Sequence, residues 1–325
     1  MTSKDERPIV VAIVGPTASG KTGLSLAIAE ELNAEIIACD SRTIYREFDI
    51  GTAKPSAEEQ ARIRHHLIDV ANPDENFTAA NFAEQGAAAI ADMQARGKLP
   101  LVTGGTGFYS RALLEGLSIP AVAPNEKLRA EMHELADTHG NTALWSKLHR
   151  LDPVTAERLG INDRFRIIRA LEVIDATGRP FSEVAVKVEP PYRTIWVGLT
   201  AEDRANLHGS IRQRFYEQMD AGMLAETQRL YERYGRSQKM MNTVNYKQLV
   251  RYIEGETDMA TAEHDALHHN MQLARRQIMW FRANPLTRWF HIDTMQKPEL
   301  YEAVGRYIKE AIANPEKIPG LGEAT

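Results

Sequence analysis

The sequence has a single cysteine, Cys39, among 325 residues, so no disulfide can form within the chain. It also has no apolar run long enough to cross a membrane, and its charged first ten residues lack the apolar core of a signal peptide. Acidic residues outnumber basic ones by 44 to 39, and a net charge of −5 excludes a globally basic nucleic-acid-binding protein. We therefore expect a cytoplasmic protein without membrane contact.

The overall composition is typical of a soluble globular protein, with 43% hydrophobic and 26% charged residues. The first half alternates apolar strand patterns with amphipathic helix patterns, which predicts an α/β fold with a parallel sheet. The expected strands are residues 9–14, 35–39 and 98–105, and the expected helices are residues 22–32 and 77–97.

Beyond Gly116 the pattern becomes helical from residue 125 to 186, and it returns to a strand at 194–200. The chain is then mainly helical up to Ala283, with a last expected strand at 288–293. The sequence thus predicts a P-loop NTPase-like sheet flanked by helices. The expected core domain comprises residues 1–122 and 190–325, and residues 123–189 form a helical insertion domain.

The first expected strand runs into the sequence GPTASGKT, which is the G-x-x-x-x-G-K-[ST] pattern of a phosphate-binding loop. Glycines let successive backbone N–H groups point at one anion, and the helix that follows adds its positive N-terminal end. Lys21 adds a full charge, and the hydroxyl of Thr22 suits Mg²⁺. The residues predicted to bind a diphosphate or triphosphate are Gly15, Pro16, Thr17, Ala18, Ser19, Gly20, Lys21 and Thr22.

A nucleotide hydrolase usually also has a strand that ends in an acid, which helps to hold Mg²⁺. The strand at 98–105 ends in Gly104-Gly105-Thr106 without an acid. The acid that does follow a strand is Asp40, and from the residues alone it is a general base, a Mg²⁺ ligand or a helix cap.

Several stretches, in this order, resemble the bacterial tRNA dimethylallyltransferase (tRNA isopentenyltransferase) family. They are GPTASGKT (15–22), DSRTIYREFDIGTAKP (40–55), HHLIDV (65–70), GGTGFY (104–109), NDRFRIIRALEVIDATG (162–178) and RRQIMWFR (275–282). The resemblance implies that the loop holds dimethylallyl diphosphate, with Mg²⁺ as cofactor, and that the dimethylallyl group passes to N6 of adenosine 37 in tRNA. It also implies a monomer, and it makes Asp40 the general base, Thr106 a contact to the tRNA nucleotide and Arg214 a contact to the diphosphate.

The resemblance further implies contacts to the anticodon stem-loop of tRNA. The implied residues are Asp40, Ser41, Arg42, Thr43, Thr106, Arg129, Phe165, Arg166, Ile167, Ile168 and Arg169. Residues 270–289 contain four arginines and no acid, and we add Arg275, Arg276 and Arg282 to the predicted tRNA contacts. The aromatic residues between them, among them Trp280, either pack internally or stack on bases. Arg42, Thr43 and Asn245 depart from the family pattern.

Three other functions remain as alternatives. An adenylate isopentenyltransferase that acts on free AMP has the same chemistry, but it needs neither a helical insertion nor an arginine-rich helix. A small-molecule kinase is supported by the phosphate loop alone. A non-catalytic RNA-binding protein leaves Lys21, Thr22 and Asp40 without a role.

Overall fold

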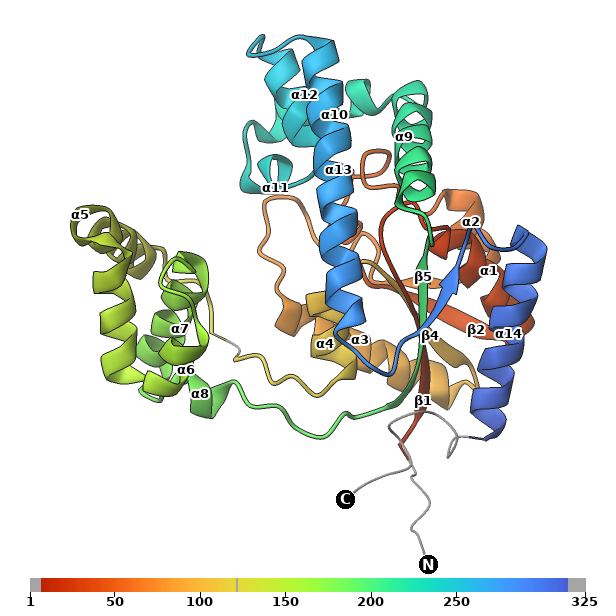
Figure 1. Cartoon of the computed structure of the whole chain (residues 1–325), viewed down its shortest axis with the longest axis horizontal. Helices are drawn as coiled ribbons and strands as arrows, with labels where there is room; N and C mark the ends of the chain where they lie inside the picture. The colour runs from red at the N-terminus through yellow and green to blue at the C-terminus, as the bar shows by residue number, and fades with distance from the viewer. Residues whose placement is uncertain (1–6, 121, 315–325) are drawn as a thin grey trace, which may run out of the picture. The chain divides into compact units, whose positions relative to one another are not determined.

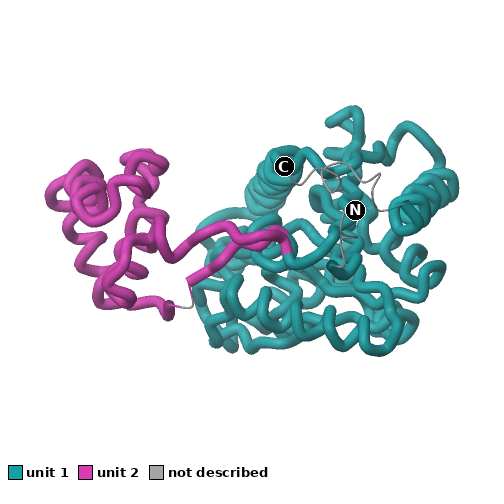
Figure 2. The backbone as a smooth tube through the Cα atoms, turned by 90° about the horizontal axis from the view of Figure 1, so that it is seen from below, with its two compact units in different colours: residues 1–114, 191–325 teal, residues 115–190 magenta. Residues whose placement is uncertain are grey.

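The computed structural model describes residues 7–120 and 122–314, so most of the N-terminal segment on which we based the expectation of no signal peptide lies outside the described residues. The chain forms two compact units (Figure 2). Unit 1 contains the residues up to Leu114 and those from Pro191 onward, and unit 2 is Glu115–Pro190. The second boundary agrees with the predicted one to within a residue. The first lies earlier than residue 122, because Leu117 pairs with Lys187 and so joins its segment to unit 2.

Unit 1 is built on a six-stranded sheet of order β3-β2-β4-β1-β5-β6, in which every neighbouring pair is parallel. The strands are β1 (Ile9–Val14), β2 (Ala34–Ala38), β3 (His65–His66), β4 (Leu99–Gly104), β5 (Arg193–Thr200) and β6 (Arg288–His291). The predicted parallel α/β sheet is confirmed. The sequence missed β3, because two residues are too few for an apolar period to show.

Helices cover both faces of this sheet (Figure 1). Those of the first part of the chain and the last one are α1 (Lys21–Glu31), α2 (Ala57–Arg62), α3 (Ala79–Ala95), α4 (Gly107–Leu114) and α14 (Lys297–Ala313). Side chains of α1 and α14, such as Leu24 and Val304, pack with Val11 and Ile13 of β1 in one fully buried cluster. All of β1 after Ile9 is buried, as expected for a central parallel strand covered on both faces.

Five further helices follow β5 and stand above the ends of the strands (Figure 1). They are α9 (Arg204–Asp220), α10 (Met223–Tyr234), α11 (Gln238–Met241), α12 (Tyr246–Ile253) and α13 (Met259–Arg282). Phe215, Met223, Leu249 and Leu267 hold four of them together in a small core of their own. In the part of the chain that the structure describes, no helix is both long and apolar enough to span a membrane.

Unit 2 is helical, as the sequence predicted, and its four helices surround a core of their own. They are α5 (Glu126–Leu151), α6 (Pro153–Arg158), α7 (Arg164–Thr177) and α8 (Phe181–Val184). The backbone leaves the helical conformation inside α5 at Gly140, where φ is 81°. Leu144 and Leu148 of α5 pack on Ile167 and Leu171 of α7. Burying these side chains gives the insertion a hydrophobic core that does not depend on the sheet.

Candidate active site

A cavity of about 1650 Å³ lies in unit 1, where the loops that follow the parallel strands meet. Residues from the phosphate loop, from the segment after β2 and from the turn after β4 line it together. The predicted site residues that line this cavity are Thr17, Ala18, Ser19, Gly20, Lys21, Thr22, Asp40, Ser41, Arg42, Thr43, Thr106, Arg214 and Arg276. The candidate site is thus formed by segments that are far apart in the sequence.

The phosphate loop joins β1 directly to α1, as its sequence predicted. Gly15 has no room for a side chain, because a Cβ there would collide with the carbonyl oxygen of Leu199. Gly20 has a φ of 78°, in the left-handed region that favours glycine, and it stands immediately before α1. The loop therefore presents the positive end of an 11-residue helix to the cavity.

Two cations share this end of the cavity. Lys21 Nζ donates a hydrogen bond to the carbonyl oxygen of Pro16 at 2.5 Å, inside its own loop. Burial, together with the nearby charge of Arg214, lowers the pKa of Lys21 to about 7, and Asp40 partly opposes this shift. Burial also lowers the pKa of Arg214. Two desolvated cations side by side form a site that favours a multiply charged anion.

Asp40 lies directly beyond β2, opposite these cations. Its Oδ1 accepts hydrogen bonds from the backbone N–H groups of Arg42 at 2.7 Å and Thr43 at 3.4 Å. The hydroxyl of Thr106 accepts from the N–H of Ser41 at 3.0 Å. A Cβ on Gly104 would collide with the carbonyl of Cys39, so glycine lets the ends of β2 and β4 approach each other. These contacts hold the carboxylate and Thr106 in one rigid corner of the cavity.

Thr43 has a polar atom that no described residue satisfies. Its Oγ1 is buried and without a hydrogen-bond partner in that part of the chain, and the residue lines the cavity. Buried polar groups are normally paired, so such an atom is typical of a group that bonds a ligand. The side chain of Arg42, in contrast, has a partner, because its guanidinium donates a hydrogen bond to the carbonyl oxygen of Asn242 at 3.1 Å.

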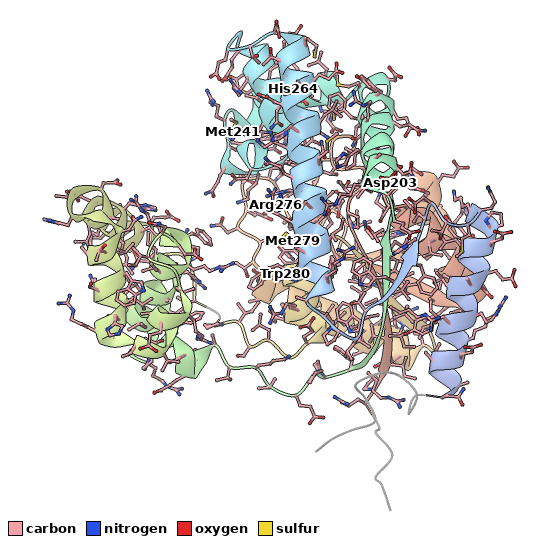
Figure 3. All side chains as sticks on the ribbon, viewed as in Figure 1. Asp203, Met241, His264, Arg276, Met279 and Trp280 are labelled. Atoms are coloured by element: carbon pink, nitrogen blue, oxygen red, sulfur yellow. The ribbon has the colours of Figure 1, made fainter. Side chains whose placement is uncertain are left out.

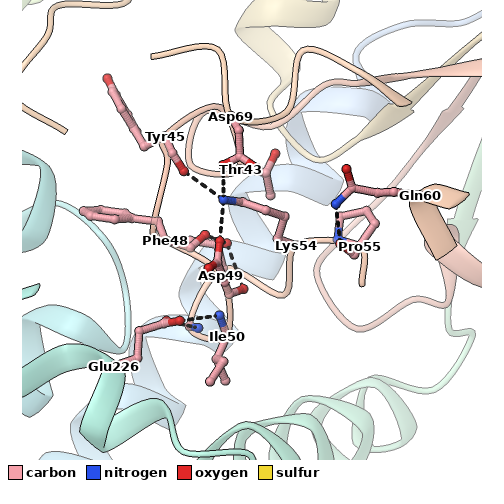
Figure 4. A network of polar contacts seen from close by, with 12 residues as sticks. Thr43, Tyr45, Phe48, Asp49, Ile50, Lys54, Pro55, Gln60, Asp69 and Glu226 are labelled. Carbon is pink, nitrogen blue, oxygen red and sulfur yellow. Dashed lines mark hydrogen bonds and ion pairs between the residues drawn. The ribbon is translucent and has the colours of Figure 1, made fainter. Parts of the chain in front are cut away.

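The segment between Asp40 and Pro55 forms one wall of the cavity, and two charged side chains hold it (Figure 4). Lys54 Nζ, whose side chain is 4% exposed, contacts the carboxylates of Asp49 at 2.6 Å and Asp69 at 2.5 Å. The buried carboxylate of Glu226 accepts from the N–H groups of Ile50 and Gly51, both at 2.9 Å. The sequence did not indicate these supports. Lys54 stands within a quoted motif, and Glu226 carried no signal.

Helix α13 passes beside the cavity and carries the cationic residues predicted for RNA. Arg276, Met279 and Trp280 project from the same flank of the helix (Figure 3). Arg275, Arg276 and Arg282 are exposed, and no ion pair to them is found among the described residues. Exposed arginines without acidic partners fit phosphate groups.

The aromatic residues around these arginines fall into two groups. Phe281 is buried, and Trp289 packs over Gly198 of β5. Trp280 is half-buried against Gly107, and it contacts the exposed Phe108 edge-on with ring centroids 6.5 Å apart. The rings of Phe108 and Trp280 are therefore partly accessible to solvent next to these arginines.

The predicted RNA contacts in unit 2 are placed in different surroundings. Phe165 is 76% exposed, and Arg166 next to it is exposed as well. Ile167 and Ile168 are buried in the core of the unit, which covers their side chains.

Arg129 and Arg169 are both engaged with the buried carboxylate of Glu172, at 2.7 Å and 3.2 Å. Arg129 therefore joins α5 to α7, whereas Arg169 shares α7 with Glu172 and also donates to the carbonyl oxygen of Val122 at 2.9 Å. Phe165 and Arg166 are the exposed members of this stretch, and Arg166 also pairs with the carboxylate of Asp163 at 3.2 Å.

The residues around Thr22 fit a magnesium ion that a diphosphate brings with it. Mg²⁺ usually keeps several waters and takes one or two protein ligands besides phosphate oxygens. The exposed Thr22 and the carboxylate of Asp40 line the same cavity, and both hydrogen bonds found for Asp40 in the described chain end on Oδ1. No cluster of three or more His, Cys, Asp or Glu that could hold a metal alone is found in residues 7–120 and 122–314.

The fold and site define an α/β protein in which a glycine-rich loop between a strand and a helix lines one cavity with the carboxylate of Asp40. Residues 43–284 match the sequence model of the family described as IPP transferase. A tRNA dimethylallyltransferase of Cyanothece sp. is 41% identical over 292 residues, which cover 90% of this chain and 95% of that protein. The protein of the same name from Chloroflexus aurantiacus is 44% identical over 279 residues, 85% of this chain and 93% of that one. This chain belongs to the IPP transferase family.

Solved structures agree with this assignment. The tRNA isopentenylpyrophosphate transferase of Bacillus halodurans is 33% identical and superposes with a TM-score of 0.72, covering 96% of this chain and 99% of that one. A eukaryotic dimethylallyltransferase that acts on tRNA has a TM-score of 0.77, covering 96% of this chain and 81% of that one. At 22% identity this second structure supports the fold alone.

Proposed function

We propose that this protein transfers the dimethylallyl group of dimethylallyl diphosphate to N6 of adenosine 37 in tRNA. One observation carries the proposal: the phosphate loop, Asp40 and Thr106 line the same cavity, while β4 ends without the acid of a nucleotide hydrolase. Membership of the IPP transferase family, together with the names of the relatives, favours this function over a kinase and over an enzyme for free AMP.

The transfer reaction requires activation of the nucleophile N6 and stabilisation of the leaving diphosphate. The lone pair of the adenine amine is delocalised into the ring, so N6 is a weak nucleophile. As N6 attacks C1 of the dimethylallyl group, the C1–O bond breaks, and the electron pair leaves with the diphosphate. Asp40 accepts the N6 proton, and Thr106, whose hydroxyl is held by the N–H of Ser41, contacts the target nucleotide.

The growing negative charge of the leaving diphosphate is stabilised by Lys21, by Arg214 and by the backbone N–H groups of residues 18–22. Mg²⁺, when bound, neutralises part of that charge, and Thr22 and Asp40 are the residues that would hold it. The target adenine must leave its stack to reach a site inside this cavity. We propose that the donor enters from one side of the cavity and the flipped adenine from the other.

Each unit carries its own proposed RNA surface. In unit 1 it comprises the residues around Asp40 and the arginines of α13, and in unit 2 it comprises Phe165 and Arg166. The anticodon stem-loop, an unpaired loop on a short duplex, suits exposed arginines and aromatic rings of this kind. We also propose that the protein acts as a monomer in the cytoplasm, which gel filtration at several concentrations and cell fractionation would test.

A transfer assay tests the function. Purified protein, Mg²⁺ and labelled dimethylallyl diphosphate are mixed with unmodified tRNA or with AMP, without ATP. Label in tRNA alone is the expected result. Label in AMP would move the assignment to an adenylate isopentenyltransferase. No label in either, with ATP consumed in a parallel reaction, would return the loop to a kinase or hydrolase.

A further inference from the structure

Gln277, in the C-terminal half of α13, joins two loops of the active site. Its Oε1 accepts a hydrogen bond from the N–H of Thr17 at 2.8 Å, and its Nε2 donates to the carbonyl oxygen of Gly105 at 3.1 Å. The contact is tight, because a Cβ on Gly105 would collide with the amide of Gln277. Glutamine and asparagine are the side chains that place a donor and an acceptor on one planar group, as this bridge requires.

The bridge continues the sheet where the ladder of β1 and β4 stops. The last paired residues of these strands are Val14 and Gly104. Beyond them the chains diverge into the phosphate loop and into the turn that carries Thr106, and Gln277 bonds to both. The two loops lie 260 and 172 residues from Gln277 in the sequence, so a helix from the last quarter of the chain sets their separation.

We propose that Gln277 is a positioning residue that fixes the distance between the donor and the acceptor in the transfer reaction. This inference rests on the proposed function, in which the loop of Thr17 holds the diphosphate and the turn of Gly105 contacts the adenosine. Transfer needs C1 of the donor and N6 of the acceptor about 3–3.5 Å apart and in line, and a misplacement of 1 Å can cost about 10²-fold in rate. A bridge between the two binding loops acts on this distance.

The test is Gln277→Met, which keeps the length of the side chain and removes both hydrogen bonds. The matched control is Gln272→Met, an exposed glutamine of the same helix that contacts His268. We expect Gln277→Met to lower the single-turnover rate at saturating donor and tRNA by about 10–10²-fold. The dissociation constants for inorganic diphosphate and for unmodified tRNA, each measured alone, should stay at their wild-type values.

Other outcomes would overturn the inference. An unchanged single-turnover rate would show that the bridge does not set the geometry. A lower melting temperature with weaker binding of both ligands would show a merely structural role. Tighter diphosphate binding would show that Gln277 competes with the donor for the N–H of Thr17.

Gly105→Ala gives a second, independent test, because its methyl group displaces the amide of Gln277 without removing it. We expect this variant to lose rate as Gln277→Met does, and the double variant to be no slower than the slower single one. A wild-type rate for Gly105→Ala, or fully additive losses, would contradict the bridge. Failure of the wild-type protein to label tRNA would instead overturn the proposed function, so the two failures are distinguishable.

Discussion

The hydroxyl of Thr106 accepts a hydrogen bond from the backbone N–H of Ser41 at 3.0 Å, which joins the end of β4 to the residue that follows Asp40. Because Asp40 in turn bonds the N–H groups of Arg42 and Thr43, four consecutive residues form one polar corner. The proposed general base and the proposed contact to the acceptor nucleotide are therefore held in one hydrogen-bonded unit.

Asp40→Asn distinguishes a role of Asp40 in proton transfer from its role in holding the backbone of residues 42 and 43. Asparagine keeps Oδ1 for the N–H groups of Arg42 and Thr43, but it cannot accept the N6 proton. We expect the single-turnover transfer rate to fall by about 10²–10⁴-fold, with tRNA binding unchanged in a filter assay. Asp74→Asn, at an exposed position outside the cavity, is the control. A variant with near-normal turnover would mean that Asp40 is not the base.

The pKa of Lys21, about 7 in the free protein, predicts proton uptake on donor binding. Bound diphosphate favours the charged ammonium and raises this pKa, so affinity is highest below pH 7 and falls as the pH rises through and beyond 7. Calorimetry with inorganic diphosphate at pH 7.5 to 8.5, in buffers of different ionisation enthalpy, measures the uptake. Arginine stays charged at every pH of the experiment, so the Lys21→Arg variant should lose the part of the proton uptake that comes from Lys21. Equal uptake by both proteins would assign the protons elsewhere.

Glu226→Ala tests the support of the cavity wall. The substitution leaves the N–H groups of Ile50 and Gly51 and the hydroxyl of Tyr246 without their acceptor. We expect the free energy of unfolding to fall by about 3 kcal/mol in a urea titration, because buried donors lose their partner. Glu232→Ala on the same helix, at an exposed position, should stay within about 0.5 kcal/mol of wild type. A loss for Glu226→Ala no larger than this would show that the wall does not need the carboxylate.

Arg275→Ala combined with Arg276→Ala tests whether α13 faces RNA. Loss of two phosphate contacts should weaken tRNA binding and reduce the slope of log K against log salt by about 1.4. The control removes Arg62 and Arg306, which are ion-paired with Glu30 and Glu302 on the surface. An unchanged slope for the α13 variant, or the same change in the control, would place the RNA elsewhere.

Much of the fold and part of the site could be read from the sequence, because those signals are local. The phosphate loop is eight consecutive residues between a strand and a helix, and Asp40 follows a strand directly. The supports Glu226 and Gln277 could not be found in this way. They act across 175 and 260 residues, and no local pattern shows which backbone N–H a distant side chain will meet.

Asn245 shows how structure explains a departure from a pattern. The resemblance led us to expect glycine there, and the residue indeed has a φ of 78° before α12. Asparagine tolerates positive φ better than other residues with a side chain. Its Oδ1 also accepts from Asn270 of α13 at 2.7 Å. The departure keeps the backbone conformation and adds a contact between two helices.

Residues 116–118 and 186–188 form a short antiparallel stem at the base of unit 2, so the insertion can be treated as an exchangeable module. The N–H of Ser118 donates to the carbonyl of Val186 at 3.1 Å, and that of Val188 donates to the carbonyl of Gly116 at 2.9 Å. The chain thus leaves and re-enters the stem on neighbouring antiparallel strands, the arrangement that a two-residue hairpin turn closes. Deleting residues 119–185 and joining the two sides of the stem with Asn-Gly would give a smaller protein in which a short hairpin connects α4 to β5. Other helical inserts could then be grafted at the same stem, which would change the surface that unit 2 presents while unit 1 stays the same.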